Sequence, residues 1–381
     1  MKKLIWITGI LCLTHLAYAT PQFARQTGNN CITCHVSVPK LNLTGENFRA
    51  LGYMMLDEND KGTEKTIPLA IWTTARYEDQ KENNVDDIFL PKVEVISGGR
   101  IGDMPLSYFV ESRLVSEGLN SDGSHKSRSG RFEDAFVQWE IDNQWSLKMG
   151  QFRALNQTDV SLRLSPSEPT LFKNSLPGDT TSDSRKQGLR SFSPTGRSPS
   201  IAVQYQAIKG ETASEGLFHG LTLPFPGEFS IPLNSEAEDT ASFELEGRLK
   251  GVFLETYYKK GMSSIGGHIF VDDDRWLATG LGTYNMGDWY TTAGVGVDDA
   301  NSQKSRMRYS LEVEYVPQWW EKVRPGVGVR AEKITKSGNE AAYIPYFIIG
   351  GPNLKHTFFM QVQYRAQENN DLFIIDFSSL F

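Results

Sequence analysis

Cysteine is scarce in this chain, whose 381 residues include only three cysteines. Cys12 lies in an apolar run near the start, which leaves Cys31 and Cys34 close together further on. Thiols so near in sequence cannot cross-link a large fold, so their role is local. The chain also lacks a second continuous apolar run and a stripe of basic residues. These absences exclude a helical membrane protein and argue against nucleic acid as a partner.

The first 19 residues have the features of a secretory signal peptide. Lys2 and Lys3 precede an apolar run from Leu4 to Leu13, and the triplet Ala17-Tyr18-Ala19 follows. A basic start, a short apolar core and an A-x-A end predict cleavage after Ala19. Loss of the two lysines takes the formal net charge from −7 to −9. We therefore expect an exported protein whose mature chain begins at residue 20.

The five residues Cys31-Ile32-Thr33-Cys34-His35 form the C-x-x-C-H pattern by which c-type haem is attached. Two thiols on one helical turn can each add to a vinyl group of the porphyrin, and the adjoining histidine supplies the proximal iron ligand. We predict one covalently attached haem c, held by Cys31, Cys34 and His35. The alternatives are a plain disulfide and a thioredoxin-like redox pair, but a redox dithiol needs a βαβ context.

Apolar residues recur at helical spacing beyond this motif, at Leu41, Phe48, Leu51 and Met55, with Gly52 as a stop signal. This pattern predicts a second short helix over one haem face. Met55 is our candidate for the distal iron ligand because it shares the face of Phe48 and Leu51. The alternatives are ligation by Met54 and two methionines that only fill gaps beside the porphyrin. Because so short a segment has little core, we expect the next domain to support it.

Apolar and polar residues alternate from Ile67 onward in about sixteen segments, the period of half-exposed strands. In the clearest segment, Arg306 to Tyr315, the odd-numbered positions are apolar or aromatic and the even-numbered positions are polar. We expect a mainly β fold, with a haem domain at 20–66 and an antiparallel outer-membrane barrel of about sixteen strands at 67–381. A soluble β-sandwich would alternate in the same way.

Connection lengths favour the membrane barrel over the sandwich. Tight turns at 102–105 and 142–144 alternate with long polar connections at 79–87, 117–130 and 155–198, as in outer-membrane barrels. Aromatic residues near strand ends predict an interfacial girdle: Trp139, Trp145, Tyr309, Tyr315 and Trp319. The 155–198 stretch is the third outer loop on this count and carries Arg163, Arg185, Arg190 and Arg197. It is either a constriction folded into the pore or a solvated loop.

The stretch from Pro21 to Gly28, running into the C-x-x-C-H motif and followed by Pro39, Leu41, Gly45, Phe48, Arg49, Gly52 and Tyr53, resembles the fused outer-membrane monohaem cytochrome–porins. Their members include the iron-oxidising cytochromes of chemolithotrophic bacteria. The resemblance covers about residues 21–53, with a porin-like Met149-Gly150-Gln151-Phe152 further on. It implies a haem domain seated in or under a sixteen-stranded barrel, with Cys31, Cys34 and His35 holding the haem.

These features together predict an oxidoreductase of the outer membrane. A bilayer core about 30 Å thick conducts electrons poorly, whereas a haem inside a wide barrel could be reached from both sides. We expect single electrons to pass from an extracellular donor, Fe(II) or a similar reductant, to a periplasmic cytochrome or other soluble carrier. Outer-membrane lipid is the remaining partner. The rival hypotheses are a diffusion porin with a structural or sensory haem and a soluble periplasmic cytochrome with a β-sandwich.

Overall fold

The computed structural model describes residues 22–27, 29–54, 68–81, 85–119, 124–128, 130–158, 163–167, 169–172, 196–207, 214–225, 251–272, 275–300, 306–318, 323–335, 341–351, 357–367 and 371–380. The signal peptide predicted at 1–19, the ligand candidate Met55 and Trp319 lie outside these residues. None of the described helices is both long enough and apolar enough to cross a membrane.

The chain before the barrel, residues 22–27 and 29–54, is called the N-terminal segment below. It contains α2 (Gln22–Thr27), α3 (Cys31–Cys34), the hairpin of β1 (His35–Ser37) and β2 (Lys40–Leu41), and α4 (Leu43–Ala50). Asn42 caps α4 because its side-chain oxygen accepts a hydrogen bond from the Gly45 amide at 3.1 Å. Gly52 follows with a positive φ of 68°. The predicted second helix is therefore confirmed.

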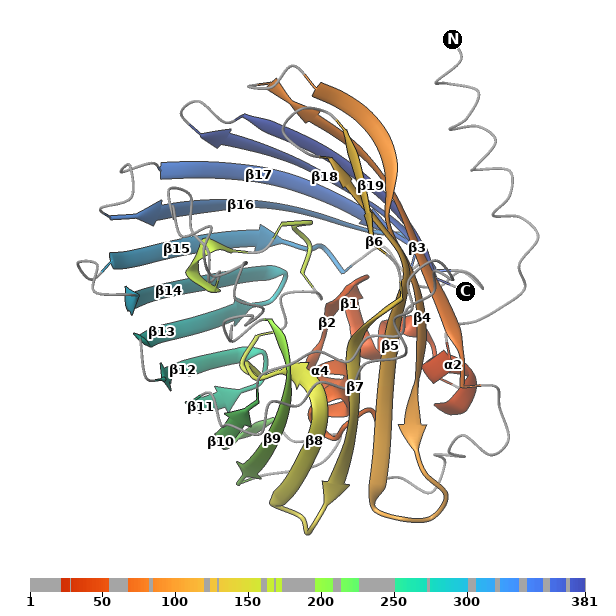
Figure 1. The fold of residues 1–381 in the computed structure, drawn as a ribbon, viewed down its shortest axis with the longest axis vertical. Helices are drawn as coiled ribbons and strands as arrows, with labels where there is room; N and C mark the ends of the chain where they lie inside the picture. The colour runs from red at the N-terminus through yellow and green to blue at the C-terminus, as the bar shows by residue number, and fades with distance from the viewer. Residues whose placement is uncertain are drawn as a thin grey trace, which may run out of the picture.

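Sixteen antiparallel strands close into a barrel through the pairings β9–β10 and β19–β3 (Figure 1). This confirms the predicted architecture and strand number. A short extra strand, β6 (His125–Arg128), pairs with the last residues of β5, beyond the part of β5 that pairs with β7. The barrel strands are β3 (Ala70–Gln80), β4 (Val85–Arg100), β5 (Leu106–Leu119), β7 (Arg131–Glu140), β8 (Trp145–Arg153), β9 (Arg197–Gln206), β10 (Glu215–Pro224), β11 (Val252–Lys260), β12 (Ser263–Val271), β13 (Arg275–Met286), β14 (Trp289–Ala300), β15 (Arg306–Tyr315), β16 (Arg324–Ile334), β17 (Ala341–Gly350), β18 (Thr357–Gln367) and β19 (Leu372–Leu380).

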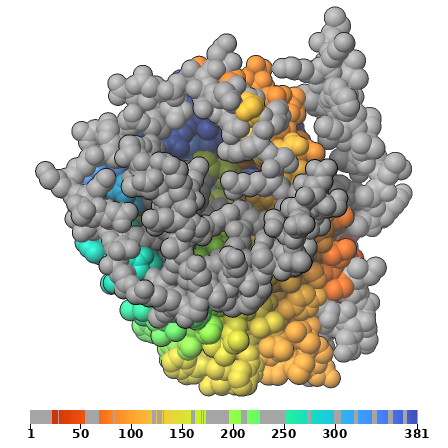
Figure 2. Space-filling view, viewed as in Figure 1, coloured from red at the N-terminus to blue at the C-terminus, as the bar shows by residue number. Residues whose placement is uncertain are grey.

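The barrel is apolar outside and polar inside, the reverse of a soluble sandwich. On β15, Met307 and Leu311 point outward and are 38% and 49% exposed, whereas Arg308 and Glu312 point inward and are each 2% exposed. Trp139 and Trp145 are exposed at the β7–β8 turn, where an interfacial girdle is expected. Figure 2 shows strands β3 to β9 as a continuous wall, coloured from orange through yellow to green. The β-sandwich hypothesis is therefore wrong.

Four tight turns lie at one end of the barrel, which we call the short-turn end. The turns at 101–105, 141–144, 261–262 and 287–288 lie there, together with the start of β3 and the end of β19. The long connections lie at the opposite, long-loop end, but two are shorter than the sequence predicted. Strands continue to Gln80 and Leu119, and β6 occupies part of the 117–130 connection. The pairing of β3 with β4 continues to Gln80 and Val85, inside the 79–87 segment that the sequence predicted as a long connection.

Candidate functional site

The C-x-x-C-H motif lies inside the barrel, against its inner wall (Figure 1). The Sγ atom of Cys31 lies 3.4 Å from Oγ1 of Thr357 on β18. Nearby, the Ser37 hydroxyl donates to the Arg324 carbonyl on β16 at 2.8 Å. On the other side, the Gln138 amide of β7 donates to the Ala50 carbonyl at 2.9 Å. The N-terminal segment is thus held by strands on opposite sides of the lumen.

A cavity lies between this segment and the wall, and we call it the motif cavity. Cys31, Cys34 and His35 all line it, and the two thiols are not joined as a disulfide. Most of the other lining is aromatic or aliphatic, including Phe23, Phe48, Tyr53, Trp72, Phe109 and Phe359. Large, mainly apolar cavities with a few polar groups are typical of cofactor sites. The lining therefore suits a flat, hydrophobic porphyrin.

His35 has the tautomer and charge state that a metal ligand needs. Its Nδ1 atom is 3.1 Å from the Pro39 carbonyl oxygen, so a proton on Nδ1 is donated to that oxygen. This leaves Nε2 as the atom with a lone pair, the usual arrangement for a metal-binding histidine. Burial lowers the pKa of His35 to about 4, so its imidazole is neutral near pH 7. The residues present thus fit a c-type haem.

The methionine predicted as a second iron ligand does not lie among the described residues of the motif cavity. Met54 is buried, at 2% exposure, but it is not among the residues that line the motif cavity. Among the described lining residues there is no methionine and no histidine besides His35. Met55 lies outside the described residues, so its assignment as distal ligand stays a prediction. Arg25 donates a hydrogen bond to the Leu69 carbonyl, which ties α2 to the start of the barrel.

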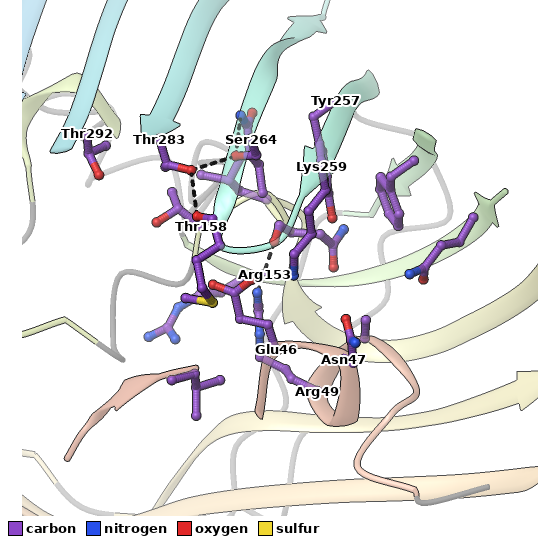
Figure 3. Close-up of a pocket in the computed structure, with 18 of the residues that line it drawn as sticks. Glu46, Asn47, Arg49, Arg153, Thr158, Tyr257, Lys259, Ser264, Thr283 and Thr292 are labelled. Carbon is purple, nitrogen blue, oxygen red and sulfur yellow. Dashed lines mark hydrogen bonds and ion pairs between the residues drawn. The ribbon is translucent and has the colours of Figure 1, made fainter. Parts of the chain in front are cut away.

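A second space, which we call the polar cavity, lies beside the motif cavity. Helix α4 brings Glu46 and Arg49 to this cavity, opposite Tyr257 and Lys259 on β11 (Figure 3). The Lys259 ammonium donates to Glu46 at 2.5 Å. Arg49 donates to the Asn156 carbonyl at 2.9 Å, which joins α4 to the start of the third outer loop.

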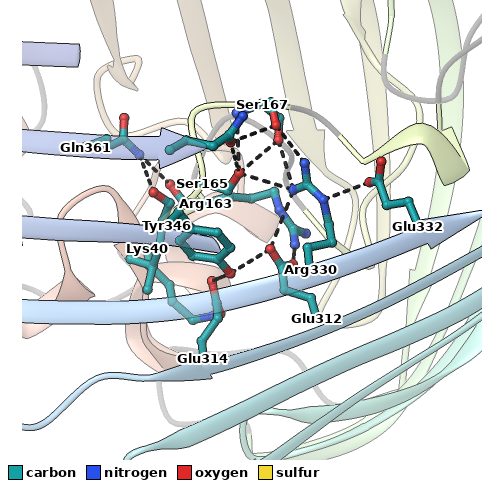
Figure 4. A network of polar contacts seen from close by, with 12 residues as sticks. Lys40, Arg163, Ser165, Ser167, Glu312, Glu314, Arg330, Glu332, Tyr346 and Gln361 are labelled. Atoms are coloured by element: carbon teal, nitrogen blue, oxygen red, sulfur yellow. Dashed lines mark hydrogen bonds and ion pairs between the residues drawn. The ribbon is translucent and has the colours of Figure 1, made fainter. Parts of the chain in front are cut away.

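The described part of the third outer loop folds into the lumen (Figure 4). Arg163 forms an ion pair with Glu312 on β15, and Ser165 donates to Gln363 on β18 at 2.7 Å. Arg330 on β16 donates to the Ser167 hydroxyl at 2.7 Å. The solvated-loop hypothesis is therefore wrong for residues 163–167, because their polar groups are bonded to the inner wall.

Of the four arginines assigned to this loop, the two that the structure describes, Arg163 and Arg197, lie at separate places. Arg163 belongs to the inward-folded part, where it is 8% exposed. Arg197 is the first residue of β9 and contacts Glu111 and Asp134 at 3.0 and 3.3 Å. Arg185 and Arg190 lie outside the described residues. The two described arginines, Arg163 and Arg197, therefore do not belong to a single selectivity filter.

The sequence prediction missed the barrel's share of the motif cavity. Trp72, Phe109 and Phe359 come from β3, β5 and β18 and point inward, where alternation predicts polar side chains. Strand β17 shows the same signal, because its inward-facing Ile344 and Ile348 pack with the N-terminal segment. Inward-facing apolar residues on the barrel strands could have revealed where the lumen is filled.

Comparison with known proteins supports the fold and leaves the cavity unassigned. No protein-family model and no curated protein matches the chain. Among solved structures, Salmonella typhi OmpF, in complex with daunomycin, matches with a TM-score of 0.52 and 11% identity, covering 82% of this chain and 97% of OmpF. The anion-selective porin from Comamonas acidovorans matches with a TM-score of 0.50 and 10% identity, covering 82% and 98%. The chain has the fold of an outer-membrane porin, and its outward apolar surface is that of an outer-membrane protein.

Proposed function

We propose that this protein is an outer-membrane electron conduit with one c-type haem attached at Cys31 and Cys34 and ligated by His35. When bound, the haem supplies a centre that accepts and releases one electron at a time. The donor would be an extracellular reductant, Fe(II) first among them. The acceptor would be a periplasmic cytochrome or another soluble carrier. The observation that carries the proposal is the C-x-x-C-H motif at the wall of a large apolar cavity inside a membrane barrel.

The chain's own residues give the site its working features. Phe23, Phe109 and Phe359 line the motif cavity with aromatic rings, which would keep water away from a bound porphyrin. Pro39 holds the imidazole of His35 in the ligating tautomer.

Outer-membrane barrels place short turns in the periplasm, so the short-turn end faces the periplasm. Thr357, beside Cys31, is the first residue of β18 at that end. The motif cavity would therefore be close to a periplasmic acceptor and separated from an external donor by the lumen.

The proposal is tested on full-length protein produced with haem c maturation and purified in detergent. We expect haem that stays attached after denaturation, one per chain, and a c-type spectrum that Fe(II) reduces within seconds. The control is the double variant Cys31→Ser/Cys34→Ser, which should form the barrel without covalent haem. Barrel formation is checked by the faster gel mobility of unheated protein. Haem reduced only by dithionite would contradict the electron-conduit proposal.

A diffusion porin with a structural or sensory haem is the second candidate, and the porin fold of the solved neighbours favours it. Planar-bilayer recording separates the two. Large, steady currents that are equal in wild type and Cys31→Ser/Cys34→Ser would support the porin. Small currents are expected for the conduit, because the N-terminal segment and residues 163–172 occupy part of the lumen.

A further inference from the structure

We infer that Lys40 and Glu314 position the histidine that would ligate the haem iron, and that their ion pair thereby lowers the reduction potential of the haem. This inference rests on the proposed function and names two positioning residues for its site. Lys40 belongs to the N-terminal segment, whereas Glu314 lies on β15 of the barrel. The barrel wall would thus act on the haem through the hydrogen bond that His35 makes.

The first observation is that one small hairpin carries both His35 and the group that fixes its tautomer. His35 is the first residue of β1 and Lys40 is the first residue of β2. The Pro39 carbonyl, which accepts from the imidazole, lies between the two strands, and the backbone of Lys40 also interacts with the imidazole. Strands of three and two residues are too short to hold this geometry by themselves. The hairpin therefore needs support from outside.

The second observation is that the barrel wall supports the hairpin along β1. Arg324 on β16 donates a hydrogen bond to the Val36 carbonyl at 2.9 Å, and the Ser37 hydroxyl donates to the Arg324 carbonyl at 2.8 Å. Val36 and Val38 are buried in one apolar cluster with Ile348 of β17. These contacts fix β1 against the wall and leave β2 to be held separately.

The third observation is that β2 is held by the ion pair between Lys40 and Glu314, and that this pair is itself confined (Figure 4). The two side chains are only 17% and 4% exposed. The Lys40 ammonium lies 4.4 Å from the ring centre of Tyr290, and the Tyr346 hydroxyl lies 2.9 Å from Oε1 of Glu314. Exposed ion pairs contribute little because their side chains remain mobile, but this pair keeps one geometry.

The pair acts on His35 through one covalent bond. The peptide nitrogen of Lys40 is bonded to the carbonyl carbon of Pro39, so fixing Lys40 fixes the oxygen that lies 3.1 Å from Nδ1 of His35. A hydrogen bond from Nδ1 makes a ligating imidazole a stronger electron donor. A stronger donor stabilises ferric iron relative to ferrous iron, which lowers the reduction potential. Loss of the ion pair should therefore weaken this hydrogen bond and raise the potential.

The test uses full-length protein with haem c attached, in detergent. Lys40→Met/Glu314→Gln removes both charges, so neither is left unpaired in the lumen. We expect the equilibrium constant for haem reduction to rise about tenfold, the low end of what outer partners of a ligating histidine contribute, or about 59 mV for one electron. The iron–histidine stretching frequency, measured by resonance Raman after photolysis of the carbon monoxide complex, should fall. Lys40→Arg keeps a cation beside Glu314 and should keep both values.

Lys259→Met/Glu46→Gln is the matched control. It also removes a lysine–glutamate pair between the N-terminal segment and the barrel, but Glu46 lies on α4 and outside the hairpin. Both readouts should stay at their wild-type values. A shift of equal size in this control would mean general loosening of the segment and would overturn the inference. Unchanged values in the haem-loaded Lys40→Met/Glu314→Gln variant would overturn it as well.

If that variant forms no haem-loaded barrel, Tyr346→Phe takes its place. This change removes only the hydroxyl beside Glu314 and should raise the equilibrium constant about threefold, the effect of one hydrogen bond, whereas an unchanged constant overturns the inference. The failure of the proposed function looks different. Wild-type haem that Fe(II) does not reduce refutes the conduit, while the redox titration still decides the positioning role. Wild-type protein without covalent haem refutes both.

Discussion

Gly45 offers a sharp test of how the C-x-x-C-H turn is positioned. It lies in the first turn of α4, where this helix crosses α3. A Cβ atom at this position would lie 2.2 Å from the Cys34 carbonyl oxygen and 2.9 Å from Cδ2 of Leu41. Both distances are far inside van der Waals contact, and the first neighbour is backbone that cannot rotate away. Gly45→Ala must therefore move α4 away from the C-x-x-C-H turn.

The cost of such overpacking is about 1–3 kcal/mol, which is a large fraction of the stability of a small segment. We expect Gly45→Ala to lower the yield of covalent haem per folded barrel, measured as pyridine haemochrome against protein. The barrel itself should keep its heat-modifiable gel mobility. Gly280→Ala on β13 is the matched control, because the added Cβ would meet only Cγ1 of Val295 at 4.0 Å. If Gly45→Ala carries haem at the wild-type level with an unchanged spectrum, the close approach of α3 and α4 does not set the site.

Three further changes test the capping of α4 and the packing of the lumen. Asn42→Ala removes the α4 cap, at a cost of about 1 kcal/mol, and should lower the thermal midpoint followed by haem absorbance; an unchanged midpoint would refute the role of the cap. Arg330→Met leaves the buried carboxylate of Glu332 without its 2.7 Å partner, which should cost about 3–5 kcal/mol and lower the unfolding temperature of the barrel by calorimetry. Gly294→Ala puts a Cβ atom 2.4 Å from Leu171, so we expect displacement of residues 170–172 and higher conductance in planar bilayers, whereas unchanged currents would count against this packing.

The grouping of the candidate site's own residues could be predicted from the sequence because it is local. Cys31, Cys34 and His35 lie within five consecutive residues, so their spacing alone brings them together. The partner of His35, the Pro39 carbonyl, is also only four residues away. Thr357 beside Cys31 could not be predicted, because 326 residues separate the two and only barrel closure makes them neighbours.

The barrel was predictable for a different reason. The side-chain period of two is a property of each strand by itself, so the outward face of β15 could be identified without its neighbours. The filling of the lumen has no such local signature. Phe109 on β5 and Ile348 on β17 occupy inward-facing positions, which elsewhere in the barrel carry polar residues. Their contact with the N-terminal segment explains why apolar side chains stand there.

The lumen contains two neighbouring cavities, the motif cavity and the polar cavity, whose linings differ in polarity. The strands that face the C-x-x-C-H motif carry Trp72, Phe109 and Phe359 at inward-facing positions, which gives the motif cavity a mainly apolar lining. The neighbouring polar cavity is lined by more charged residues, among them Lys148 and Arg153. An apolar cavity alone would hold a cofactor without access, and a polar lumen alone would pass solutes without electron transfer. Tyr53 and Arg153 line both cavities, so only single side chains separate the mainly apolar space from the polar one.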